Sequence, residues 1–150
     1  MTTESTPLPG ELELLARAEE LLSRAFAPYS NIHVACVVEL EDGSRHDGVN
    51  VENASLGLTI CAERNALFRA MASGAGVPGR REGPAIARVL FTSNSDLVVV
   101  PCGACRQVLA ELAPRAVVLF GSNGRIHSRW ASPAVLLPEA FDGTWRGNAP

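Results

Sequence analysis

Lysine is absent from this chain of 150 residues, whose thirteen basic side chains are all arginine. The absence excludes any mechanism that needs a lysine Schiff base, a lysine base or the phosphate-binding lysine of a P-loop. The 16 acidic residues outnumber the basic ones and give a formal net charge of −3. This balance argues against a broad basic surface of the kind that binds nucleic acid non-specifically.

Long apolar runs are also missing. No uncharged apolar stretch approaches the roughly 18 residues of a membrane-spanning helix, and the first ten residues are polar, unlike a signal peptide. We therefore expect a soluble protein of the cytoplasm. Because 47% of the residues are hydrophobic and 19% are charged, the chain is expected to fold rather than to remain disordered. Its length is that of one ordinary domain.

The hydrophobic pattern predicts helices and strands that alternate in the middle of the chain. The expected helices cover 11–26, 61–72, 102–112 and a short segment from 133 to about 138. The expected strands cover 33–40, 45–50, 86–92, 116–120 and 125–130, with hairpin turns at 42–43 and 121–124. Alternating strands and helices flanked by hairpins predict an α/β fold, with one mixed sheet covered by helices.

The chain has four cysteines, Cys36, Cys61, Cys102 and Cys105. In a reducing compartment such residues are more often metal ligands, catalytic groups or buried apolar side chains than disulfides. Cys102 and Cys105 lie one helical turn apart at a predicted helix start, and Cys61 begins another predicted helix. Helix N-termini favour thiolates, so two converging helices could offer three thiolates to Zn²⁺ and leave its fourth position open.

Glu63 follows Cys61 by two residues, so its carboxylate can face the metal without binding it. A carboxylate in that place can take a proton from an activated water molecule and pass it to a leaving group. The combination of Cys-x-Glu with a later Pro-Cys-x-x-Cys is typical of the zinc-dependent base deaminases. This sequence has the version with three cysteines.

Two other uses of the cysteines stay open at this point. A redox-active Cys102–Cys105 pair would need neither Cys61 nor Glu63. A closed structural zinc site would need Cys36 as its fourth ligand. Cys36 stands in the apolar strand VACVV, where a small buried side chain is the more natural interpretation.

With these motifs in place, the chain resembles the small, nucleoside-specific branch of the cytidine deaminase family. The resemblance spans about 11–141, which leaves a polar N-terminal tail at 1–10 and a C-terminal tail at 142–150. Its motifs are APYS at 27–30, NVENA at 50–54, CAER at 61–64, PCGACRQ at 101–107 and LLP at 136–138. It implies three α/β/α layers around a five-stranded mixed sheet.

The resemblance also implies roles for individual residues. Cys61, Cys102 and Cys105 would hold the zinc, with Glu63 as the proton shuttle. Arg64 would bond to the cysteine sulfurs and offset part of their negative charge. The other residues implied by the family pattern would bind the nucleoside: Asn50 and Glu52 at the ribose, and Phe141 stacked on the base of a neighbouring subunit's site.

The activity implied is zinc-dependent hydrolysis of cytidine and deoxycytidine to uridine and deoxyuridine, with release of ammonia, as in pyrimidine salvage. In this chemistry an activated water attacks C4 of the ring, while Glu63 protonates N3 and then the departing amine. The resemblance further implies a homotetramer with shared active sites, and a small nucleoside as the ligand, with no polynucleotide and no membrane.

Three positions depart from the family pattern: Ile32 stands where the family usually has Phe, Ala35 where it has Gly, and Leu56 where it has Tyr. These changes bear on base stacking, substrate preference and subunit contacts rather than on the zinc chemistry. Alternatives are a deaminase of another cytosine compound such as blasticidin S, an editor of polynucleotides, or a non-catalytic zinc module. The tail residue Trp145 has no role assigned by the sequence.

Overall fold

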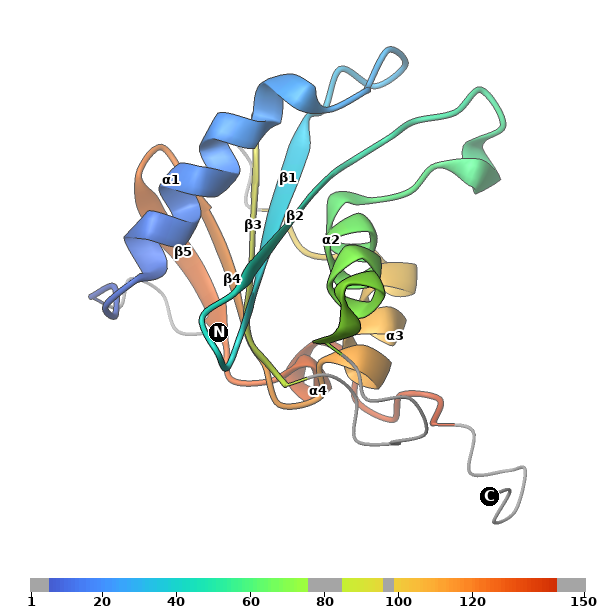
Figure 1. The fold of residues 1–150 in the computed structure, drawn as a ribbon. Helices are drawn as coiled ribbons and strands as arrows, with labels where there is room; N and C mark the ends of the chain where they lie inside the picture. Colours follow the sequence, from blue (N-terminus) through green and yellow to red (C-terminus); the bar gives the residue numbers. More distant parts are fainter. Residues whose placement is uncertain (1–5, 76–84, 96–98, 143–150) are drawn as a thin grey trace.

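The computed structural model describes residues 6–75, 85–95 and 99–142, and Figure 1 shows a central sheet with helices on both faces. The strands are β1 (Val34–Leu40), β2 (Arg45–Val49), β3 (Ile86–Ser93), β4 (Val117–Ser122) and β5 (Arg125–Trp130). They lie in the order β2-β1-β3-β4-β5. All neighbours are antiparallel except β3 and β4, which are parallel and are connected through a helix. The predicted mixed five-stranded sheet is confirmed.

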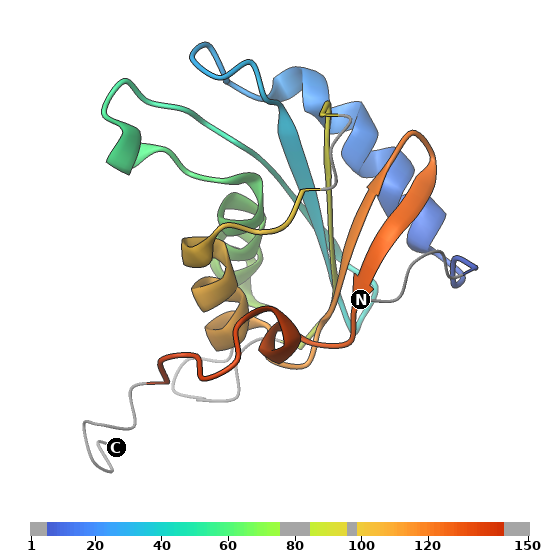
Figure 2. The same ribbon diagram turned by 180° about the vertical axis from the view of Figure 1, so that it is seen from behind.

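The helices form two outer layers. They are α1 (Glu11–Leu21), α2 (Ala62–Ala70), α3 (Gly103–Leu112) and the short α4 (Pro133–Leu136). Helix α1 covers one face of the sheet, whereas α2 and α3 lie together on the other, as the two opposite views agree (Figures 1 and 2). The three-layer α/β/α architecture expected from the sequence is therefore present. Within the described residues, no helix is both long and apolar enough to cross a membrane.

Each face of the sheet has its own hydrophobic core. On the α1 face, Leu14 and Leu15 pack against Val37, Leu90 and Leu119, and all five are fully buried. The core on the opposite face contains apolar side chains of α2 and α3 together with Cys36, Val38, Val89, Phe91, Val118 and Phe120. Strands β1, β3 and β4 are thus covered on both sides, which explains their continuous apolar runs in the sequence.

The first helix ends earlier than its apolar periodicity suggested. Helix α1 stops at Leu21, and residues Leu22–Arg24 form one tighter 3-10 turn. Phe26 then bonds to the segment after β2: its N–H donates to the carbonyl of Asn50 at 3.0 Å, and its carbonyl accepts from the N–H of Glu52 at 2.8 Å. The prediction of helix up to residue 26 was wrong because this long-range pairing requires extended backbone there.

Gly48 sets the spacing between the sheet and α2. A Cβ atom at this position would lie 2.3 Å from the backbone nitrogen of Ala66 and 2.5 Å from the carbonyl oxygen of Ala62. Only a glycine lets the two backbones approach this closely. The contact holds the first turns of α2 against β2, and those turns carry the residues considered next.

Candidate active site

The N-termini of α2 and α3 bring three thiols together. Cys61 and Cys102 are the N-cap residues of these two helices, and Cys105 lies on the first turn of α3. The sulfur atoms of Cys61 and Cys102 are 3.7 Å apart, and those of Cys102 and Cys105 are 3.4 Å apart. All three sulfurs lie within 4.8 Å of one another. Tetrahedral Zn²⁺ with bonds of about 2.3 Å separates its sulfur ligands by about 3.8 Å, so the thiols fit this ion.

The electrostatics of the cluster favour a thiolate at Cys61. Hydrogen bonding from Cys105, helped by Arg64 and Cys102, lowers the pKa of Cys61 to about 5. The same Cys61–Cys105 hydrogen bond keeps the proton on Cys105 and raises the pKa of that thiol, with burial adding to the effect. Cys105 is buried, Cys61 half-buried and Cys102 exposed, so the cluster opens toward solvent on the Cys102 side.

Arg64 extends along the cluster from the first turn of α2. Its Nη2 donates to the sulfur of Cys61 at 3.7 Å and to the carbonyl oxygen of Thr59 at 3.0 Å. Its buried Nε finds no hydrogen-bond partner among the described residues. The guanidinium therefore places a fixed positive charge beside the thiols.

Glu63 lies beneath the cluster with only 5% of its surface exposed. Burial raises the pKa of its carboxyl to about 7, and the nearby Cys61 charge adds to the rise. Hydrogen bonds, including one with Cys105, oppose that shift. A carboxyl with a pKa near 7 can both accept and donate a proton near neutral pH.

Cys36 lies apart from the three-thiol group. Its side chain is fully buried in the core beneath α2 and α3, and burial raises its pKa well above the ordinary value. The group of residues that could hold a metal contains Cys61, Cys102 and Cys105 but not Cys36. The prediction that Cys36 is a packing residue is confirmed, and a closed four-cysteine site is excluded.

Asn50 and Glu52 both bind the loop that precedes β1. The Asn50 amide accepts from the N–H of Val34 and donates to the carbonyl of Ile32, each at 2.8 Å. Glu52 accepts from the N–H groups of Tyr29 and Ser30 at 2.9 and 3.2 Å, and from the Ser30 hydroxyl. These bonds, led by that of the hydroxyl, lower the pKa of Glu52. Both side chains thus order the loop at residues 29–34.

Phe141 lies in the segment after α4, and its ring is 64% exposed. The Gln107 side chain of α3 donates to the Phe141 carbonyl at 2.7 Å and holds this segment. Gln107 lies on the second turn of α3, two residues after Cys105, so this bond places the Phe141 backbone beside α3. Trp145 lies outside the described residues.

The three residues that depart from the family pattern differ in whether they are exposed or buried. Ile32 and Leu56 lie on loops, with exposed fractions of 46% and 77%. Ala35 is fully buried in β1, where it faces the α1 core. Only the first two changes therefore alter the outer surface of the chain.

Sequence reasoning missed two residues that shape the site. Gly48 fixes the distance between β2 and α2, and a lone glycine inside a strand pattern was the available signal for such a close approach. The backbone carbonyl of Thr59 accepts a hydrogen bond from Arg64, and a backbone acceptor of this kind cannot be recognised from the sequence.

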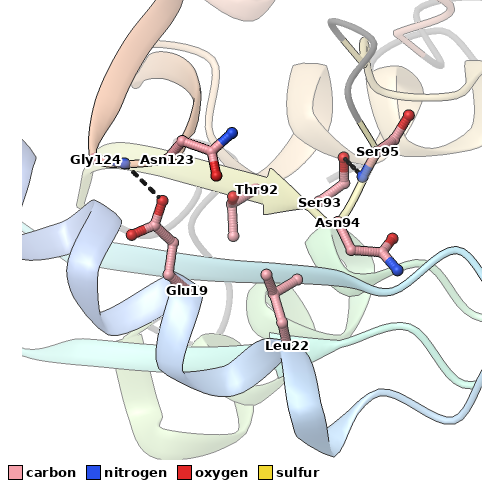
Figure 3. A pocket seen from close by; sticks show the side chains of 8 residues that line it. All are labelled: Glu19, Leu22, Thr92, Ser93, Asn94, Ser95, Asn123 and Gly124. Atoms are coloured by element: carbon pink, nitrogen blue, oxygen red, sulfur yellow. Dashed lines mark hydrogen bonds between the residues drawn. The ribbon is translucent and has the colours of Figure 1, made fainter.

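Figure 3 shows a polar hollow that is separate from the thiol cluster. It has a volume of about 420 Å³ and lies between the end of α1, the end of β3 and the β4–β5 turn. Its floor includes Thr92, whose buried hydroxyl has no partner among the described residues. The hollow is on the α1 face of the sheet, so it takes no part in the arrangement around Glu63.

Comparison with known proteins places the chain in a family. Residues 10–121 match the family described as the cytidine and deoxycytidylate deaminase zinc-binding region. A cytidine deaminase from Halalkalibacterium halodurans is 42% identical over 128 residues, which cover 85% of this chain and 91% of that protein. A cytidine deaminase from Sporosarcina psychrophila is 36% identical over 129 residues, covering 86% and 89% of the two chains.

Comparison with solved structures points to the same family. The crystal structure of a cytidine deaminase from Burkholderia pseudomallei has a TM-score of 0.75 and 39% sequence identity, and the match covers 87% of this chain and 98% of that one. The matched region contains the three thiols that fit a zinc ion, together with Glu63 and Arg64. This chain belongs to the cytidine and deoxycytidylate deaminase zinc-binding family and is a zinc-dependent hydrolytic deaminase.

Proposed function

We propose that this enzyme hydrolyses cytidine and deoxycytidine to uridine and deoxyuridine, releasing ammonia. The observation that carries the proposal is the buried Glu63 carboxyl, which bonds to Cys105, one of three thiols that match a tetrahedral zinc site. The relatives that are 36–42% identical are themselves named cytidine deaminases, which supports a nucleoside substrate. The residues proposed to hold the zinc are Cys61, Cys102 and Cys105.

Glu63 and Arg64 have different roles in the proposed deamination. When bound, zinc lowers the pKa of a water molecule, so that a strong nucleophile is available near neutral pH. Glu63 accepts one proton of the water that attacks C4 and delivers it to N3 of the ring. It then takes the second proton from the new C4 hydroxyl and gives it to the departing amine, so that C4 keeps the oxygen as a carbonyl. Arg64 offsets part of the thiolate charge through its bond to Cys61. The proton balance closes because one water is consumed for each ammonia released.

The nucleoside contacts are proposed on the same basis. Asn50 and Glu52 keep unused hydrogen-bonding capacity after binding the 29–34 loop, since an amide and a carboxylate each have more sites than this loop occupies. That remaining capacity suits a ribose hydroxyl. Phe141, whose side chain is 64% exposed, is proposed to stack on the base in the active site of a neighbouring subunit.

Replacing Glu63 with Gln tests the proton transfer. We expect Glu63→Gln to lower kcat by about 10²- to 10⁴-fold, because the amide cannot move a proton, while the zinc content stays near one per chain. Loss of cytidine absorbance and atomic absorption measure the two quantities. Full activity in this variant would refute Glu63 as the proton shuttle, and loss of zinc would instead assign it a structural role.

A substrate panel tests the specificity. The purified enzyme is incubated with cytidine, deoxycytidine, cytosine and blasticidin S, and the loss of cytosine absorbance is followed. The proposal expects comparable rates for the two nucleosides and little turnover of the other compounds. Equal turnover of blasticidin S or cytosine would show that the ribose is not recognised, and would contradict the assignment of Asn50 and Glu52.

We propose that the enzyme assembles as a homotetramer through two exposed apolar loops, at residues 26–32 and 51–60. These loops touch at the Phe26–Val51 bridge and carry six large apolar side chains that are exposed in the single chain: Phe26, Tyr29, Ile32, Val51, Leu56 and Leu58. Exposed apolar side chains gathered in one region are typical of a protein interface.

Replacing Leu56 tests this assembly. We expect Leu56→Ser to shift the mass measured by light scattering from a tetramer toward smaller species, since it removes the most exposed apolar side chain of the two loops. Leu12→Ser serves as the control, because Leu12 is also exposed but lies on α1, outside both loops. An unchanged mass for Leu56→Ser, or an equal shift for both variants, would contradict the proposed interface.

The cellular compartment is proposed from the thiols. All four cysteines are free, and three of them are needed as thiolates. Such a site is best preserved in a reducing environment such as the cytoplasm.

A further inference from the structure

A trough along the open edge of β2 carries charges that the deaminase chemistry does not use. We call it the edge trough; it is bounded by Arg24 after α1, by Asp47 and Val49 of β2, and by Asn65 and Arg69 of α2. Its volume is about 330 Å³. The trough runs from the α1 side of the sheet across the β2 edge to the α2 side.

The acidic side chain of the trough is already neutralised. Asp47 accepts a two-pronged pair of bonds from Arg17, with Nε to Oδ1 at 2.7 Å and Nη2 to Oδ2 at 2.8 Å. The same contact raises the pKa of Arg17. A carboxylate bound on both oxygens by one guanidinium contributes no net charge to its surroundings.

Arg24 and Arg69 are therefore the charges that remain in the trough, and both are positive. Both side chains are exposed, and neither has an ion pair or hydrogen bond within the described part of the chain. Two guanidinium groups without a described partner thus line one concavity. They make this edge an attractive place for an anion.

The strand edge adds a backbone donor. Asn50 directs its N–H toward β1, where it bonds to the carbonyl of Val34 at 3.1 Å. Residues alternate along an antiparallel strand, so the N–H and carbonyl of Val49 point outward into the trough. The Asn65 side chain confirms this direction, because its amide donates to the Val49 carbonyl at 2.8 Å.

We propose that the edge trough binds a soluble small molecule that carries a diphosphate group. Guanidinium forks match phosphate oxygens, and these two come from different elements on opposite sides of β2. A ligand that engages both must present anionic oxygens in two directions, which a diphosphate does and a single carboxylate does not. The Val49 N–H supplies a donor between them.

Binding is tested on the zinc-loaded, full-length enzyme with inorganic pyrophosphate as the probe. Isothermal titration calorimetry at low ionic strength is expected to show saturable binding that weakens as salt is added. Arg24→Gln and Arg69→Gln should each weaken binding about tenfold or more, since each removes one charge-assisted contact. Orthophosphate should bind more weakly than pyrophosphate. Deaminase activity without added anion should be unchanged in both variants.

The matched control is Arg115→Gln, which removes one exposed positive charge in the turn between α3 and β4. It should leave pyrophosphate binding unchanged. Absent binding, or equal heats in all four proteins as chelation of the zinc would give, overturns the proposal. Sedimentation with phosphatidic acid vesicles that depends on Arg24 and Arg69, without saturable pyrophosphate binding, would overturn it in favour of a membrane ligand.

Discussion

A single guanidinium, that of Arg64, lies beside the three thiols that are proposed to hold the zinc. Three thiolates carry more negative charge than Zn²⁺ can cancel, so a bound water is a poorer acid than one on a site with neutral ligands. Arg64 counters this excess by donating to Cys61 while the Thr59 carbonyl holds it in position. The Nη2 atom of Arg64 makes both bonds, so a substitution that removes the guanidinium removes the positive charge and the bond to Thr59 together.

Replacing Arg64 with Gln should slow the enzyme without unfolding it. We expect Arg64→Gln to lower kcat by about 10- to 100-fold, which is typical for a residue that bonds to a metal ligand. Activity assays combined with zinc analysis measure the effect. Arg115→Gln is the control for loss of one positive charge and should behave as the unmodified enzyme. Full activity in Arg64→Gln would show that the positive charge is dispensable.

Local spacing explains why the thiol cluster could be predicted from the sequence. Cys102 and Cys105 are three residues apart at the start of one helix, and the apolar pattern around them predicted where that helix begins. The engagement of Asn50 and Glu52 with the 29–34 loop could not be predicted, because it joins residues about twenty positions apart through backbone groups. The sequence shows which side chains can bind a metal, but it does not show which backbone groups a side chain will bond to.

At the scale of elements, the packing of α2 on β2 controls the position of the centre. Gly48 permits a backbone contact that no other residue allows, and α2 begins its first turn there with Cys61 and Glu63. The hairpin signal at 42–43 predicted the strand that became β2, but it could not show which helix would pack at Gly48. The end of α1 was mispredicted for a related reason, since the pairing of Phe26 with the segment after β2 overrides the helical pattern.

Replacing Gly48 with Ala tests this contact. The added methyl would meet backbone atoms at 2.3 and 2.5 Å, which cannot move aside as a flexible side chain can. We expect Gly48→Ala to lower the free energy of unfolding by about 1–3 kcal/mol, as is typical of overpacked sites, and to reduce kcat by displacing α2. Urea denaturation and activity assays measure the two effects.

Gly57→Ala is the matched control, because a Cβ at Gly57 would meet no atom within 4 Å. It should change the free energy of unfolding by no more than a few tenths of a kcal/mol. Similar losses in both variants would mean that the methyl group itself is not the cause, and would contradict the close-contact explanation.

At the scale of the whole molecule, the two cores stabilise the sheet independently of the metal. The α1 core contains no residue of the thiol cluster, and the opposite core is built mainly from apolar side chains of α2, α3 and the strands. A small zinc finger differs, since it has no comparable core and unfolds when its metal is removed. We therefore expect the metal to be needed mainly for catalysis and to contribute less to the stability of the fold.

Removing zinc with a chelator should therefore abolish activity but leave the fold intact. We expect an unchanged far-ultraviolet circular dichroism spectrum and a cooperative thermal transition with a lower Tm, because metal binding adds stability by mass action. Restoring zinc should restore activity. Unfolding of the metal-free protein at room temperature would contradict the independence of the two cores.

The separation of the ligands along the chain also orders the events of folding. Cys61 and Cys102 are 41 positions apart, and β3, which lies between them in the sequence, occupies the middle of the sheet. A nascent chain offers only the local Cys102–Cys105 pair, and two thiols hold zinc less firmly than three. We therefore expect zinc to bind late in folding, after the sheet has assembled, so that a misfolded chain would lack both the ion and the activity.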